Sequence, residues 1–220
     1  MKHSTLILLF FSLLTFIGCY TVEDASDVNQ DRIKANYCTI FNGTHQTTKS
    51  VISFRFGQTP LRVSNPMYYT NQRLHEKEDL IFGLHYSRQH NGIKNGDYEW
   101  TDENGSTYSN SVRAYPFSLL QSITELKKYT YYNLNWEGEE IPYEAGSFTI
   151  SVNSLEDHTT VTFTTGELIE IHSDDLTSLP LGRAIVTISR HHKEPVEQRT
   201  PAGGKSTVIF EREYEILIID

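Results

Sequence analysis

Cysteine is scarce in this chain, since only Cys19 and Cys38 occur among its 220 residues. Two thiols supply neither a disulfide framework nor a four-thiolate zinc site. Basic residues are also few, because 19 Lys and Arg stand against 28 Asp and Glu and leave a formal net charge of −9. An acidic chain without a cluster of Lys and Arg is poorly suited to a phosphate backbone, so we expect no nucleic-acid partner.

The sequence also lacks a hydrophobic run long enough to cross a membrane as a helix. The longest apolar stretch runs from Leu6 to Ile17, whereas a spanning helix needs about 20 residues. Lys2 precedes this stretch and the small residue Gly18 follows it. A positive start, a short apolar run and a small residue are typical of a secretory signal peptide. We therefore predict a signal peptide over residues 1–18.

The junction at the end of this leader has a more specific pattern. The residues Phe16-Ile17-Gly18-Cys19 resemble the lipobox of bacterial lipoprotein precursors, although Phe16 stands where Leu is usual. The resemblance implies export, transfer of diacylglycerol to Cys19, cleavage after Gly18 and acylation of the new N-terminus. We expect an envelope lipoprotein anchored in the outer membrane, either facing the periplasm or exposed at the surface. The alternative is a secreted protein in which Cys19 is incidental.

Residues 19–35 are polar and acidic and show no periodicity, which predicts a flexible tether. Glu23 and Asp24 resemble the surface-export signal of Bacteroidetes-type lipoproteins. The alternative is that any linker leaving a membrane tends to be polar.

The rest of the chain, residues 36–220, has the two-residue period of β-strands. Hydrophobic residues make up 38% and aromatic residues 12%, which excludes intrinsic disorder. Strands are predicted over 50–56, 80–86, 148–152, 161–164, 184–189 and 208–219. Many short strands predict an all-β fold, a β-sandwich of the Ig-like or a related type. Two small sandwiches with a boundary near 110–135 are the alternative.

Three local patterns refine this fold. Asn104-Gly105 predicts a two-residue hairpin turn that places Trp100 opposite Ser109 and Tyr98 opposite Ser111. Residues 117–128 have apolar residues at helical spacing after Pro116, so we predict one short helix there. The last strand, 215–220, is apolar on both faces and is expected to be central and covered on both sides.

The segment 173–190, where Leu-Pro and Gly lead into alternating Val and Ile, resembles the late strands of Ig-like modules in bacterial surface lipoproteins. This resemblance implies the fold and no functional residue.

One polar group is a candidate chemical site. Glu170, His172 and Asp174 would share one face of a strand beginning near residue 167. A carboxylate, an imidazole and a carboxylate at this spacing could bind a metal or serve acid–base chemistry, as in sandwich-fold glycosidases. The alternative is the solvated face of an amphipathic strand.

The remaining histidines have no zinc-site spacing, so we expect surface histidines and no metal or other cofactor. Cys38 is expected to be buried and inert.

Aromatic residues near turns are a second candidate site. Tyr98, Trp100 and Trp136 could stack on sugar rings, although most aromatic residues of a sandwich lie in its core. The leading hypothesis is a membrane-anchored, non-enzymatic interaction or assembly module with a protein or glycan partner. The alternatives are a carbohydrate-binding lipoprotein and, second, a glycoside hydrolase or metal-dependent enzyme.

Overall fold

The computed structural model describes residues 21–142 and 146–220. The predicted signal peptide and Cys19 lie outside the described residues. The all-β class is confirmed, because the only helical segments among the described residues are two 3-10 turns, Ala25–Asp27 and Gln30–Arg32. The remaining regular structure consists of strands in one large and three small sheets.

The large sheet has eleven strands. Eight of them follow the order β1 (Glu23–Asp24), β4 (Thr59–Arg62), β3 (Thr47–Phe56), β2 (Ile33–Asn42), β19 (Gly204–Ile219), β18 (Gly182–Glu194), β15 (Ser147–Ser154) and β16 (Thr160–Thr165). Three further strands join this row: β8 (Gly83–Asn91) pairs with β3, β7 (His75–Asp79) with β8, and β12 (Glu125–Lys127) with β19.

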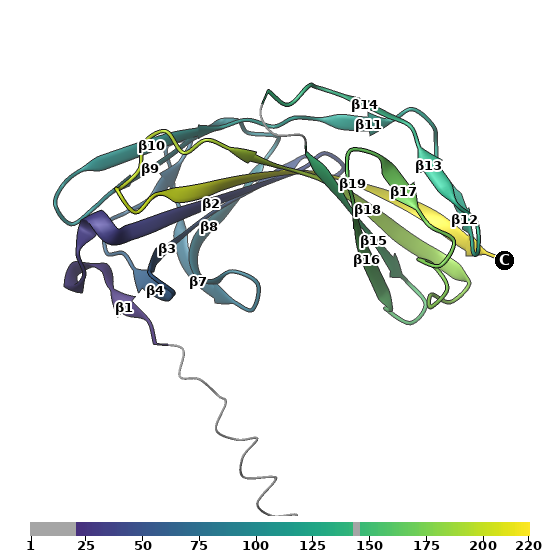
Figure 1. Ribbon diagram of the computed structural model, residues 1–220, viewed down its shortest axis with the longest axis horizontal. Coiled ribbons are helices and arrows are strands. Elements are labelled where there is room, and N and C mark those ends of the chain that lie inside the picture. Colours follow the sequence, from purple (N-terminus) through teal and green to yellow (C-terminus); the bar gives the residue numbers. More distant parts are fainter. Residues whose placement is uncertain (1–20, 143–145) are drawn as a thin grey trace, which may run out of the picture.

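Two long strands, β18 and β19, join the halves of the molecule. The first part of β19 lies parallel to β2, its last three paired residues lie parallel to β12, and β18 pairs with it antiparallel along its length. Figure 1 shows the resulting arch, with β3, β4 and β7 at one end and β15 and β16 at the other. The two halves therefore share β18 and β19.

The three small sheets pack against one face of the large sheet, and the hydrophobic core lies between them. Over the first half lies the sheet β10 (Thr107–Val112), β9 (Gly96–Thr101), β5 (Tyr68–Tyr69) and β6 (Gln72–Arg73). Over the second half lie the pairs β11 (Phe117–Leu119) with β14 (Trp136–Gly138) and β13 (Tyr132–Leu134) with β17 (Ile169–Ile171). Alternate residues of the long strands, such as Val186 and Ile188, are buried beneath these small sheets, as the period of a strand requires.

The helix predicted over 117–128 is wrong. This segment contains β11 and β12. Strand β12 pairs in parallel with the end of β19, where Leu126 lies opposite Ile218 and is fully buried. The backbone hydrogen bonds of this pairing and the burial of Leu126 outweigh a local helical pattern. The tether predicted over 19–35 is wrong for its described C-terminal part, because Ala25 is buried and Gln30 Nε2 donates to its carbonyl at 2.6 Å.

Two predicted strands differ in detail. The strand predicted from Leu80 begins only at Gly83, because Leu80 to Phe82 form the turn between β7 and β8. The last strand is central, but only one of its faces is covered: Ile216 and Ile218 are buried, whereas Leu217 is 49% exposed.

The hairpin of β9 and β10 is confirmed, with its register shifted by one residue. Trp100 pairs with Tyr108 and Tyr98 with Asn110. The turn has three residues instead of two, because Asp102 N–H donates to the Ser106 carbonyl and Gly105, at φ +84°, completes the loop. A three-residue loop that ends on a left-handed glycine is the next most common hairpin type.

Candidate functional site: the Trp136–Arg190 cleft

Two of the three candidate aromatic residues lie in the core. Tyr98 is fully buried and Trp100 is 2% exposed. Their polar atoms are also used, since Trp100 Nε1 donates to Tyr37 Oη at 2.9 Å and Val51 N–H donates to Tyr98 Oη at 3.0 Å. The expectation that these two rings form a surface platform is wrong, because they sit on the face of β9 that packs against the large sheet.

The three polar residues Glu170, His172 and Asp174 do not lie together on one strand face. Strand β17 ends at Ile171, so Asp174 lies in the following turn instead of on a common strand face. Glu170 accepts a hydrogen bond from the exposed Tyr131 hydroxyl, and His172 is exposed. No cluster suited to a metal ion occurs among the residues that the structure describes.

Several histidines differ from the expectation of surface positions, because His85, His90 and His192 are buried. Cys38 is half-buried on β2 and unpaired. Burial raises the pKa of its thiol to about 11. A thiol with a raised pKa is a weak nucleophile at neutral pH, as expected for an inert cysteine.

The third candidate aromatic residue, Trp136, lies at an open cleft of about 370 Å³. It is half-buried on β14, and its Nε1 donates to the Glu167 carbonyl at 3.1 Å. Phe148 of β15 lies beneath it, with ring centroids 5.0 Å apart. Strand β14 runs close to β11 here, because a Cβ on Gly138 would come within 2.7 Å of the Pro116 carbonyl oxygen.

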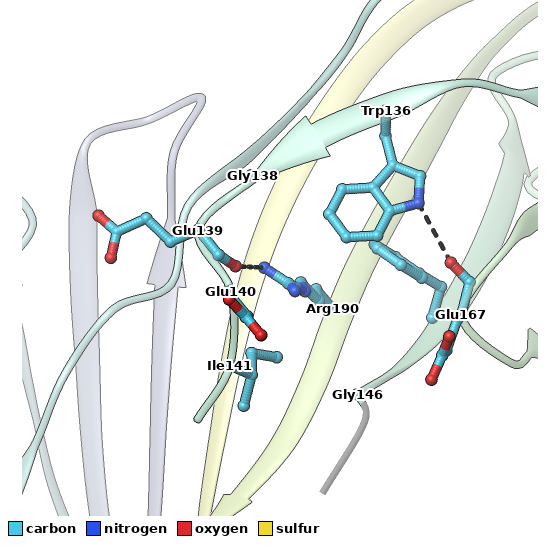
Figure 2. Close-up of a pocket in the computed structure, with 9 residues that line it drawn as sticks. Trp136, Gly138, Glu139, Glu140, Ile141, Gly146, Glu167 and Arg190 are labelled. Carbon is cyan, nitrogen blue, oxygen red and sulfur yellow. Dashed lines mark hydrogen bonds between the residues drawn. The ribbon is translucent and has the colours of Figure 1, made fainter. Parts of the chain in front are cut away.

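Arg190 lies at the base of the same cleft. It projects from the core face of β18, between its cross-strand neighbours Phe148 and Phe210, and is only 6% exposed. Its guanidinium carbon is 4.7 Å from the Trp136 ring centroid, and Nη1 donates to the Glu139 carbonyl at 2.8 Å. Figure 2 shows the arginine between the indole ring and the segment of Glu139 and Glu140.

The charge of Arg190 has no carboxylate counterpart among the described residues, since none of their ion pairs includes it. Burial alone lowers its pKa, but an arginine stays protonated in proteins. A guanidinium carries five N–H donors, and the single carbonyl contact to Glu139 uses one of them. A buried cation held in this way is unfavourable for stability.

Three glutamates lie at the rim of the cleft, and none of them forms an ion pair with Arg190. Glu139, Glu140 and Glu167 line it and are exposed. Glu139 forms an ion pair with Arg113, outside the cleft lining. Because Arg113 balances Glu139, the remaining Glu140 and Glu167 stand against Arg190 and leave a small excess of negative charge, which disfavours a phosphate or another strongly anionic ligand.

A signal for Arg190 is present in the sequence. Ala184, Val186, Ile188 and Arg190 occupy alternate positions of one strand, so an arginine continues a row of apolar core residues. A charged residue at an inward-facing position is unusual and calls for a partner. The indole ring that partners it comes from a strand more than fifty residues earlier, which the pattern cannot indicate.

Comparison with known proteins adds no further assignment: no protein-family model matches this chain, and no curated protein is significantly similar to it. In the described part of the chain, no helix has the length and hydrophobicity required to cross a bilayer.

Proposed function

We propose that this chain is a lipid-anchored binding protein of the cell envelope, and that its binding site is the Trp136–Arg190 cleft. We infer the lipid anchor from the lipobox-like junction that ends at Cys19, and we place the anchored protein at the outer membrane. The binding role follows from one observation above all: a buried guanidinium with spare donors lies beside an aromatic ring at the base of an open cleft.

The chemistry of the lining favours a neutral saccharide as ligand. The indole of Trp136 offers an apolar surface on which the C–H face of a sugar ring packs. Arg190 donates hydrogen bonds to hydroxyl oxygens, and the carboxylates of Glu140 and Glu167 accept hydrogen bonds from hydroxyl groups. The cleft volume lies within the range of about 300–1,000 Å³ that small-molecule sites occupy.

A binding role without catalysis is supported by the separation of the polar residues that suggested an enzyme. Glu170, His172 and Asp174 do not line the cleft, and Glu170 is engaged by Tyr131. A hydrolase at these three residues is therefore not part of the proposal.

A glycan array probed with the chain from residue 20 onward tests the ligand class. We expect binding to neutral saccharides, weakened by Trp136→Ala and retained in the matched control Tyr131→Ala, which removes an exposed aromatic ring outside the cleft. Binding to no saccharide, or binding that Trp136→Ala leaves unchanged, contradicts the proposed site. If the same chain, tested on a peptide array, preferred Lys- and Arg-rich peptides to saccharides, the acidic rim would be the recognition element and the saccharide proposal would be wrong.

A further inference from the structure

The tip of the β7–β8 hairpin presents two large apolar side chains to solvent. Leu80 has a relative exposure of 106% and Ile81 of 84%, the highest values among the exposed large hydrophobic residues of the described chain. They are consecutive and form the turn together with Phe82. Isolated exposed apolar residues are ordinary, but two consecutive, strongly exposed ones at the end of a hairpin form a small apolar patch.

The turn is held in this form by its flanking residues. Asp79 Oδ1 accepts hydrogen bonds from the backbone N–H groups of Ile81 at 3.0 Å and Phe82 at 2.7 Å. The Phe82 ring turns back onto the hairpin, 5.1 Å from Lys49 Nζ and 5.4 Å from the His85 ring. The hydrogen-bonded turn therefore keeps Leu80 and Ile81 pointing outward.

The tip lies at the same side of the molecule as the start of the described chain. Strand β1 pairs with β4, where Asp24 faces Arg62, and Arg62 Nε donates to Glu76 of β7 at 3.1 Å. Figure 1 shows β1 and the end of the β7–β8 hairpin extending from the same side of the arch. Cys19 precedes Glu23 by four residues, which span at most about 14 Å when extended.

We propose that Leu80 and Ile81 insert into the bilayer leaflet that carries the acyl chains of Cys19. This inference rests on the lipid anchor of the proposed function and adds a second contact that orients the arch on the membrane. A membrane suits the tip better than a protein partner does, because two residues are too few for a stable protein interface. Strand β7, which leads into the tip, is polar and exposed throughout, as required of a segment at headgroup level.

The charges near the tip specify how this contact depends on lipid composition. Glu76, Glu78 and Asp79 outnumber Lys77 on β7. The contact should therefore be apolar and should not require anionic lipid or weaken in salt.

Fluorescence quenching by brominated lipid tests the insertion. The chain from residue 20, with an N-terminal hexahistidine tag in place of the acyl chains, is bound to phosphatidylcholine vesicles containing nickel-chelating lipid. We expect the added indole of Ile81→Trp to be quenched by brominated acyl chains, at both low and high salt. Adding Leu80→Asp to this variant should reduce the quenching.

Leu120→Trp is the matched control, because Leu120 is 60% exposed on the other half of the arch. Quenching of Ile81→Trp that is no stronger than that of Leu120→Trp overturns the inference. The tag makes this outcome independent of lipidation in cells, so failure of the Cys19 anchor is recognised separately, by mass spectrometry of the protein from its native envelope.

Discussion

The guanidinium carbon of Arg190 lies 4.7 Å from the centroid of the Trp136 ring, and the two residues come from opposite layers of the second half of the molecule. Arg190 belongs to the large sheet and Trp136 to the small sheet above it. The contact places a cation at the floor of a cleft whose rim is acidic. The proposed binding role of the cleft rests on this contact, because burial of a cation without a carboxylate partner costs free energy.

Replacing Arg190 with methionine should separate stability from binding. The methionine keeps an unbranched side chain but removes the buried charge, so we expect the free energy of unfolding to stay the same or rise. A hydrogen bond to a charged group contributes about 1.5–3 kcal/mol, so affinity for the saccharide identified on the array should fall about tenfold or more. Urea denaturation and titration calorimetry measure the two effects. A marked loss of stability would show that Arg190 is primarily structural.

Removing the Tyr98 hydroxyl should destabilise the first half of the sandwich. This hydroxyl accepts from Val51 N–H at 3.0 Å, donates to the Cys38 carbonyl at 2.9 Å and lies 2.8 Å from Thr39 Oγ1. Tyr98→Phe leaves buried polar groups without this partner, which costs about 1–3 kcal/mol. Tyr131→Phe, at an exposed tyrosine, is the control and should change the free energy of unfolding little. Equal effects of the two substitutions in urea denaturation would contradict this account.

The Cys38 thiol should react slowly with iodoacetamide near neutral pH. Burial raises its pKa to about 11 from an ordinary value of 9.0, and the thiolate is the reactive form. In a Cys19→Ala chain, where Cys38 is the only thiol, the alkylation rate should rise steeply only as the pH approaches 11. A rate at pH 8 equal to that of the urea-unfolded chain would contradict the burial.

The same shift of the Cys38 pKa has a consequence for stability. The folded state holds the proton more tightly than the unfolded state does, so this contribution is fully present below pH 9 and is lost as the pH rises towards about 11. Cys38→Ala should therefore flatten the decline in unfolding free energy over this interval. Denaturation curves at pH 8 and pH 10.5 measure the difference.

Substitution of Cys19 tests the membrane anchor. Cys19→Ala removes the acceptor thiol, so we expect metabolic labelling with palmitate to be lost and the protein to remain uncleaved or to be released. Cys38→Ala is the matched control and should leave labelling unchanged. Labelling that persists in Cys19→Ala would exclude this residue as the lipidation site, and protease treatment of intact cells distinguishes surface from periplasmic exposure.

Local sequence was sufficient for several of the longer strands, among them β3, β15, β18 and β19. The alternation of Ala184, Val186 and Ile188 identifies both a strand and its buried face, because side-chain direction along a strand depends only on the backbone period. Asn104-Gly105 likewise located the β9–β10 turn. The register was missed by one residue, because the hydrogen bond between Asp102 and Ser106 lengthens the loop.

Contacts between distant segments decided the rest. The segment 117–128 contains strands because β12 pairs with β19. Tyr98 and Trp100 are core residues because their side chains contact β3 and β2, at Val51 and Tyr37. The same holds for the cleft: Arg190 meets Trp136 only when the layer above β18 is in place. A sequence pattern determines which way each side chain points along its own strand. Which surface it then meets depends on the packing of strands that are far apart in the chain.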